Sequence, residues 1–475
     1  MESKHLFSEW TRRDFMRATL LAGAGLATLD LASCIGQPSS SSQLADTLIV
    51  GLGGGPANLN PIGAGQTTQL YAYWRAIFDT LIWTDHNHNY IPRLATSWKA
   101  VGDTTWEFAL RKNVQFHNGE PFDATSVKFT MDQILDPNNL ATIRASLSGV
   151  KAVEIVDPYT IRIHTTTPFP TLLVALTQAP IVPAKYVSSN PGQALQHPIG
   201  TGPFKFAEWI QGDHISLARN DNFYLQKPPT ANLDIRIIPD DSARVAALQA
   251  GNIHIAQTIP FDAILEVSNT AGVAIKSSYV DAALVIEFDT VNGGPVTNPL
   301  VRQALNFAVD KEQINNTIMS GKEKLIAGQV LTEGLLGYNS ALKPVPYDPA
   351  KAKQLLAQAG YPNGFDLTLN GPTGRYPADV DILTAVAAQL AKVGVRAQAN
   401  PMNTSVWATK LNNGGLSPAF LVAWYSFGEP GLAMNWMTLY SASGKYYYKE
   451  AQYNSLVTAA SQTLWRDPRN LVHLI

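Results

Sequence analysis

Residues 92–129 place a strand, a tight turn and a helix in immediate succession, and this order constrains the fold most. Apolar side chains alternate along residues 105–110, as in a strand with one buried face. Asn118 and Gly119 then give a strong turn signal. Residues 126–135 carry apolar side chains at helical spacing, so the chain is expected to mix strands and helices around a shared core.

The same stretch matches a known order of residues. It reads P-x-LA-x-SW from Pro92 and W-x-F-x-LRK-x-V-x-F-x-NG-x-PF-x-A-x-x-V from Trp106. Two further matches are P-x-GTGP-F from Pro198 and VRQAL-x-x-A-V-D from Val301. Together they closely resemble the family 5 extracellular solute-binding proteins, the receptors for peptide, nickel, glutathione, sugar and opine ABC importers. The resemblance implies an α/β fold of the type II periplasmic-binding-protein class, cluster C, with two lobes, a hinge and an extra subdomain.

The resemblance also divides the chain. It implies a first domain from residues 46–85 and 177–280, an extra subdomain from 86–176 and a third domain from 281–475. It further implies a helix at about residues 69–83. In the family, a segment that returns to the first domain follows the region where this sequence ends, so we expect the given sequence to be cut short there.

The predicted third domain contains a βαβ unit. Residues 365–370 and 395–400 have strand character, and residues 379–393 between them have helical spacing and end before Gly394. Such a unit implies parallel strands with a right-handed crossover.

Composition excludes several classes of function. With 475 residues, 45% of them hydrophobic, the chain can bury a large core and form two or three domains. Its 35 basic and 37 acidic residues give a net charge of -2, without the basic footprint of a nucleic-acid-binding protein. It lacks the G-x-S-x-G and H-E-x-x-H motifs and any cofactor fingerprint, which disfavours an enzyme. With the family resemblance, we predict a monomeric binding protein without cofactor, and a Tat-exported enzyme is the alternative.

The first 45 residues read as an export and anchoring signal. Arg12 and Arg13 precede a short apolar run, as in a Tat signal, and Leu-Ala-Ser-Cys ending at Cys34 resembles a lipobox. We predict a signal peptide over residues 1–33, lipidation of Cys34 and a flexible tether over residues 34–45. The protein would then be extracytoplasmic and held at the membrane by lipid.

The predicted ligand contacts lie in two loops. Residues 420–430 read as a buried strand that releases aromatic residues into a loop at its carboxyl end, where α/β proteins bind ligands. The candidate contacts are Trp424, Tyr425, Phe427 and Glu429 in this loop, with Gly54 and Gly55 after the first predicted strand. For each aromatic ring, a purely structural role in the core is an equally good interpretation.

Two histidines raise a separate possibility. His86 and His88 lie in a hydrophilic segment with Asp85, and imidazoles beside a carboxylate can bind a metal ion. Because no third ligand is near in the sequence, we interpret the segment as a turn and predict no metal site.

The resemblance implies two partners, a small solute and the transmembrane subunits of an ABC permease. In peptide-binding relatives, an aspartate in the loop after the tryptophan salt-bridges the peptide's amino terminus, whereas here Ser426 and Phe427 stand in that neighbourhood. A peptide is the first expectation. A nickel or other metal chelate, a sugar and an opine remain alternatives, as does a sensor that feeds a signalling partner.

Overall fold

The first sheet of the computed structural model begins with the strand at the start of the described chain. The structure describes residues 46–56, 58–62, 71–86, 88–139, 141–335, 337–426, 447–448, 450–456 and 459. The first sheet has the order β11-β1-β10-β9-β8. Its strands are β1 (Thr47–Leu52), β8 (Phe204–Ile210), β9 (His214–Arg219), β10 (Asn232–Ile237) and β11 (Ile255–Ala256). β1 runs parallel to β10 and β11, while β8, β9 and β10 are antiparallel.

The second sheet contains the strand predicted at residues 105–110. Its order is β4-β5-β7-β6, all antiparallel, with β4 (Ala95–Gly102), β5 (Thr105–Leu110), β6 (Val150–Asp157) and β7 (Thr160–Thr165). A two-stranded hairpin, β2 (Ile82–Thr84) with β3 (Tyr90–Pro92), precedes it. The helices that accompany the first and second sheets are α2 (Tyr71–Ile77), α3 (Ala124–Leu135), η2 (Thr142–Leu147), α4 (Leu172–Leu176), α5 (Ala184–Ser189), α6 (Pro191–Ala194), α7 (Asp241–Gln249) and α8 (Ile264–Ser268).

The third sheet has the order β12-β15-β13-β14. Its strands are β12 (Ala282–Phe288), β13 (Asp366–Thr373), β14 (Arg396–Asn403) and β15 (Ala419–Tyr425). The accompanying helices are η3 (Gly294–Thr297), α9 (Pro299–Ala308), α10 (Lys311–Ile318), α11 (Pro349–Gln358), α12 (Asp379–Ala391) and α13 (Thr404–Asn412). β13 pairs in parallel with β14 and with β15, which confirms the predicted βαβ unit.

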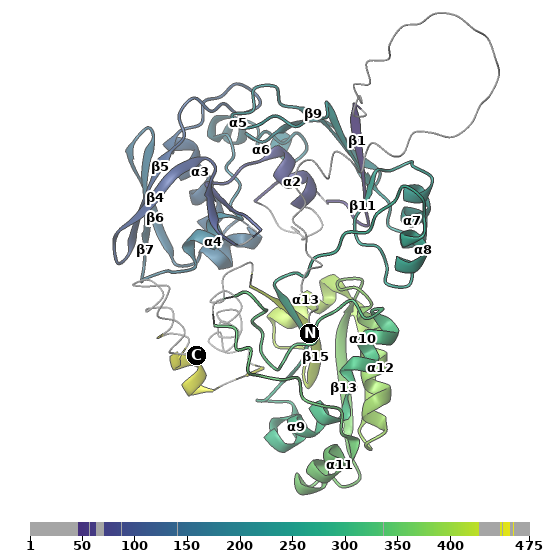
Figure 1. Ribbon diagram of the computed structural model, residues 1–475. Helices are drawn as coiled ribbons and strands as arrows, with labels where there is room; N and C mark the ends of the chain where they lie inside the picture. The colour runs from purple at the N-terminus through teal and green to yellow at the C-terminus, as the bar shows by residue number, and fades with distance from the viewer. Residues whose placement is uncertain are drawn as a thin grey trace, which may run out of the picture.

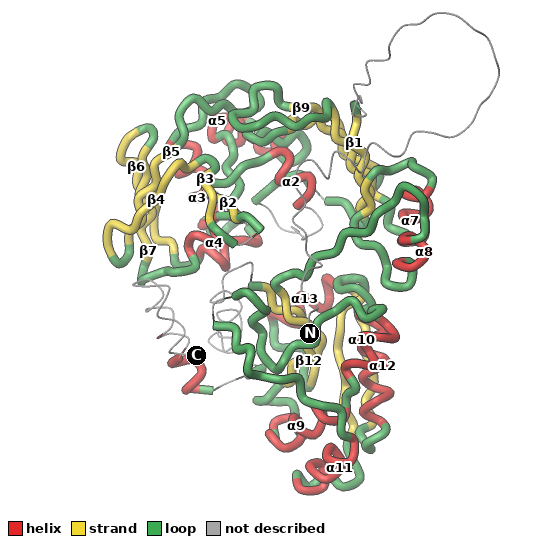
Figure 2. Tube along the Cα trace, in the orientation of Figure 1, coloured by secondary structure: helices red, strands yellow, loops and turns green. Residues whose placement is uncertain are grey.

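Buried side chains divide the molecule into two lobes. One continuous apolar core joins the first sheet, the second sheet and the β2–β3 hairpin, and we name the described residues 46–280 the upper lobe. Two other cores cover the two faces of the third sheet, and we name the described residues from 281 onward the lower lobe. In Figures 1 and 2 the upper lobe lies above the lower lobe. This is the two-lobed α/β architecture that the sequence predicts.

Helix caps follow local chemistry. Asp123 accepts hydrogen bonds from the backbone N–H groups of Thr125 and Ser126 and so begins α3. Asp348 caps α11 in the same way through Lys351 N, as its position before Pro349 predicts. Asp240 caps α7 and accepts a hydrogen bond from Ala243 N.

The predicted helix over residues 69–83 is wrong in its extent. α2 ends at Ile77, and β2 begins at Ile82. The Thr80 hydroxyl donates to the Ile82 carbonyl at 2.7 Å, and such local side-chain bonds compete with helical pairing. None of the helices in the described chain is long and apolar enough to cross a membrane.

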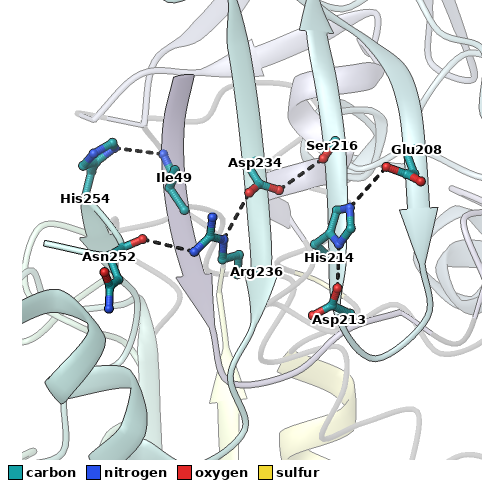
Figure 3. Close-up of polar contacts among 9 residues, drawn as sticks. All are labelled: Ile49, Glu208, Asp213, His214, Ser216, Asp234, Arg236, Asn252 and His254. Carbon is teal, nitrogen blue, oxygen red and sulfur yellow. Dashed lines mark hydrogen bonds and ion pairs between the residues drawn. The ribbon is translucent and has the colours of Figure 1, made fainter. Parts of the chain in front are cut away.

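The outer face of the first sheet carries a polar network (Figure 3). Asp234 on β10 accepts hydrogen bonds from the Ser216 hydroxyl and from Arg236 Nε. His214 on β9 contacts Asp213 through Nδ1 at 2.8 Å and Glu208 through Nε2 at 3.4 Å. The Asp213 carboxylate raises the pKa of His214, Glu208 adds to this effect, and partial burial opposes it.

This network makes one contribution to stability pH-dependent. A raised pKa in the folded state means that the contribution of His214 is fully present below the unfolded pKa of about 6.5 and is lost as pH rises through the folded pKa. We expect His214→Gln to lower the unfolding free energy by a few tenths to about 1 kcal/mol at pH 5.5, and by less at pH 8.5. Thermal unfolding at both pH values checks this, and an equal loss at both would contradict it.

Candidate functional site

The carboxyl ends of three neighbouring strands meet at one edge of the lower lobe. β13, β14 and β15 run in the same direction, so the residues that follow them share one edge of the third sheet. In Figure 1, α13, which begins where β14 ends, lies on the side of the lower lobe that faces the upper lobe. Ligands of open α/β sheets bind at such edges, which makes this edge the first candidate site.

The turn after β13 places a positively charged side chain, that of Arg375, at this edge. The Asp379 carboxylate accepts hydrogen bonds from the backbone N–H groups of Gly374, Arg375 and Tyr376, at 3.2, 2.9 and 3.1 Å. Asp379 is buried at the start of α12, where the helix dipole favours a negative charge. The turn is therefore rigid, and it presents the exposed Arg375 side chain.

Aromatic rings fix the guanidinium group of Arg375. Its Cζ atom lies 5.2 Å from the ring centroid of Trp407 and 5.5 Å from that of Tyr376. Its Nε donates to the Tyr376 hydroxyl at 3.1 Å, and that hydroxyl also accepts from Ala423 N of β15 at 3.1 Å. Within the described ranges no carboxylate forms an ion pair with Arg375, so its remaining N–H groups can bind an anion.

Of the predicted aromatic contacts, Trp424 is buried. Its side chain is 5% exposed in the apolar cluster that α13 covers. Its indole Nε1 donates to Glu287 Oε2 at 2.9 Å. Burial raises the pKa of Glu287 to about 7. The hydrogen bond from Trp424 acts in the opposite direction and lowers this pKa, and the negative charge of the nearby Asp289 raises it further. The indole is thus oriented by β12, and its contact with ligand stays a prediction.

Tyr425 ends β15 beside the arginine turn. The pKa of Tyr425 is raised, mainly by burial and also by the nearby Tyr376, while the positive charge of Arg375 lowers it. Tyr425 packs against the same apolar core as Tyr376, whose hydroxyl accepts a hydrogen bond from Arg375. Phe427 and Glu429 lie outside the described residues, so their role stays a prediction.

The two glycines lie in the upper lobe, after β1. β1 points toward the lower lobe in Figure 1, so the segment at its end faces the interlobe side. A Cβ atom on Gly55 would approach the Ile237 side chain to 3.1 Å, so bulk at this position is limited. Contact of Gly54 and Gly55 with solute stays a prediction.

A buried arginine holds the glycine segment. Arg244 donates to the carbonyls of Ile238, Gln257 and Thr258 at 2.8, 3.0 and 2.7 Å, and it pairs with Asp241. Its Nη1 would lie 3.1 Å from a Cβ atom on Gly53. The end of β1 is therefore packed against a fixed charge whose donors are satisfied. Sequence reasoning singled out neither Arg244 nor Arg375, because neither lies in a known motif.

The two histidines do not converge on a metal site. Among the residues that the structure describes, no group of three or more His, Cys, Asp or Glu side chains is placed to hold a metal ion. His88 instead lies 3.3 Å from Asp281, between its Nε2 and the carboxylate Oδ2. Between β2 and β3, His88 N donates to the Asp85 carbonyl at 3.1 Å, as expected for the predicted turn.

Comparison with known proteins gives a consistent result. The family model described as "Bacterial extracellular solute-binding proteins, family 5 Middle" matches residues 89–446. The glutathione-binding protein GsiB of Shigella flexneri is 28% identical over 96% of this chain and 89% of its own length. A glutathione-binding protein GsiB of Pectobacterium atrosepticum is 29% identical over 82% of this chain and 77% of its length.

Solved structures share the fold. The periplasmic binding protein DppA of Helicobacter pylori, in complex with the peptide STSA, superposes with a TM-score of 0.76 at 24% identity, over 90% of each chain. AgaA of A. tumefaciens R10, in complex with agropinic acid, gives 0.73 at 27% identity over 90% of this chain and 88% of its own. The type II periplasmic-binding-protein fold predicted from the sequence is confirmed.

Proposed function

This chain belongs to the family 5 bacterial extracellular solute-binding proteins, and we propose that it captures a small solute bearing a carboxylate group for an ABC importer. The proposal rests on Arg375. Its guanidinium group is stacked on aromatic rings at the carboxyl edge of the third sheet, and no described carboxylate neutralises it. A planar guanidinium binds a carboxylate through two parallel hydrogen bonds, so a solute carboxylate fits this position.

The solutes of the relatives agree with this chemistry. Glutathione, the peptide STSA and agropinic acid, which occur in the names or titles of the relatives and solved structures, all carry a carboxylate. We propose a peptide-like solute first, with glutathione and short peptides as leading candidates. Agropinic acid supports an opine as the second candidate, because AgaA is 27% identical to this chain.

Calorimetric titration tests the proposal. Glutathione, a tetrapeptide, agropinic acid and a nickel–histidine complex are added separately to the purified protein, followed by the C-terminal amide of whichever peptide binds. We expect binding by one of the carboxylate-bearing solutes and weaker binding by its amide. Recovery of the solute unchanged after incubation supports a receptor, and its conversion into product would instead favour the Tat-exported enzyme.

We further propose that the protein is exported by the Tat route and anchored through lipid on Cys34, which lies outside the described residues with its signal peptide. The twin arginines and the lipobox are independent signals at a suitable spacing, and two or more acyl chains anchor a protein stably. We expect Cys34→Ala to move the protein from the membrane fraction to the soluble fraction of the cell envelope. Retention of this variant in membranes would contradict lipidation.

The remaining predictions about organisation are proposals of the same kind. We propose that solute is enclosed by closure of the two lobes, that the monomer presents it to the permease, and that residues 46–85 with 177–280, 86–176, and 281 onward form the three domains. The three main sheets are compatible with these boundaries, since each sheet draws its strands from one of these segments. Loss of solute uptake on gene deletion would separate an importer from a sensor.

A further inference from the structure

A contact between two ionisable side chains, one from each lobe, lies beside the candidate site. His88 lies in the turn between β2 and β3 of the upper lobe, and Asp281 directly precedes β12 of the lower lobe. His88 Nε2 is 3.3 Å from Asp281 Oδ2, with the two side chains 37% and 21% exposed. The contact is therefore partly shielded from water but accessible to protons. It is an ion pair only when the imidazole is protonated.

The turn that carries His88 is fixed by its own hydrogen bonds. The Asp85 carboxylate accepts from Asn89 N at 2.9 Å and from Asn89 Nδ2 at 3.1 Å, and Asp85 N donates to the Asn89 carbonyl at 2.9 Å. His88 itself has a φ of 63°, an uncommon backbone conformation for a residue other than glycine. The surrounding bonds hold it there, and the imidazole is aimed at Asp281 of the lower lobe.

The partner carboxylate is fixed to the lower lobe on two sides. The Asp281 carbonyl accepts from Ser426 N at 2.8 Å, and Asp281 Oδ1 accepts from the Thr332 hydroxyl at 3.4 Å. Ser426 directly follows β15, so Asp281 is attached to the edge of the third sheet where Arg375 lies. A movement of this edge relative to the upper lobe changes the distance between His88 and Asp281.

We propose that His88 and Asp281 form a proton-dependent latch that holds the two lobes in the arrangement of this structure. The latch goes beyond the proposed function and does not depend on which solute is bound. Asp85 and His86 are the other titratable groups described in the same turn, and Glu333, which pairs with Lys324, follows Thr332 in the chain. The Asp85 carboxylate accepts a hydrogen bond from the Asn89 side chain. Lys324 Nζ and Glu333 Oε2 form an ion pair at 2.7 Å. Asp281 is thus the acceptor that His88 faces.

Distance measurements between spin labels test the latch without any ligand. Labels are placed on cysteines that replace the exposed Lys185 on α5 and Lys353 on α11, with Cys34→Ala to remove the native thiol. At pH 5.5 the arrangement with the contact made should dominate. At pH 8 we expect the ratio of the arrangement with the contact to the arrangement without it to fall by roughly two- to fivefold. This change corresponds to the loss of a partly exposed ion pair.

Three variants assign the shift to this pair. His88→Ala and Asp281→Asn should each abolish the pH response, and His88→Gln should abolish it while keeping a neutral hydrogen-bond donor. His86→Ala is the matched control from the same turn and should respond to pH as the parent protein does. An unchanged pH response in either His88→Ala or Asp281→Asn overturns the latch, as does a parent protein without any response. Unchanged thermal unfolding shows that the variants are folded.

Discussion

Replacing Arg375 by alanine is expected to weaken binding of the carboxylate-bearing solute by roughly 10- to 100-fold. A charge-assisted hydrogen bond contributes about 1.5–3 kcal/mol, and Arg375 is the described cation stacked at the carboxyl edge of β13 and β15. Its turn is held by Asp379 and its ring partners are buried, so the loss of the guanidinium should leave the site in place. Titration calorimetry with the solute that binds best measures the change.

Two comparisons make this result specific. Arg396 is an exposed arginine at the opposite, amino end of β14, paired with Asp366, so Arg396→Ala should leave the affinity unchanged. Amidation of the solute carboxylate should weaken binding to the parent protein but add little in Arg375→Ala, because both changes remove the same interaction. Equal affinities of Arg375→Ala and the parent protein would show that the carboxylate binds elsewhere.

Gly200→Ala is expected to destabilise the protein by about 3 kcal/mol or more. A Cβ atom at this position would lie 2.1 Å from the Ile77 carbonyl oxygen and 2.8 Å from the Phe78 ring. The obstacle is mainly backbone at the end of α2, so no change of rotamer can relieve it. Two backbone hydrogen bonds hold this turn in place. Gly202 N donates to the Ile77 carbonyl at 2.9 Å, and His117 N donates to the Gly200 carbonyl at 2.9 Å. Chemical unfolding measures the loss.

Gly192→Ala is the matched control for this substitution. Gly192 lies in α6, and nothing lies within 4 Å of an added Cβ atom. Alanine should therefore be neutral there or stabilise by up to about 1 kcal/mol. If Gly200→Ala unfolds at the same denaturant concentration as Gly192→Ala, the close approach of the turn to α2 is not required for stability.

Sequence patterns predicted the elements whose residues lie close together along the chain. The alternation at residues 105–110 became β5, and the helical spacing between two strand-like segments became the parallel pair β13–β14 joined by α12. The end of α2 was missed, because Asp79 and Thr80 look compatible with a helix but are buried in a turn. Burial of this segment in the upper lobe and the local bond from Thr80 to the Ile82 carbonyl end the helix at Ile77.

The candidate site was only partly visible in the sequence. A strand in this region was predicted, but Trp424 and Tyr425 lie within β15 and not in the loop after it. Arg375 becomes significant only when Tyr376 and Trp407 lie beside it. Those rings come from a turn and from α13, which sequence spacing does not connect. For Trp424, alternation along β15 cannot reveal that α13 covers its face. Similarly, His88 reads as part of a turn until the fold brings Asp281 to it.

Native mass spectrometry of the protein purified from its own cells tests the central claim most directly. The complex is measured intact, and the small molecule released on denaturation is then identified. We predict one molecule of a carboxylate-bearing solute per chain, with a peptide-like compound first and an opine second. Release of a neutral sugar, or of any solute without a carboxylate, would contradict the assignment of Arg375 as the group that recognises it.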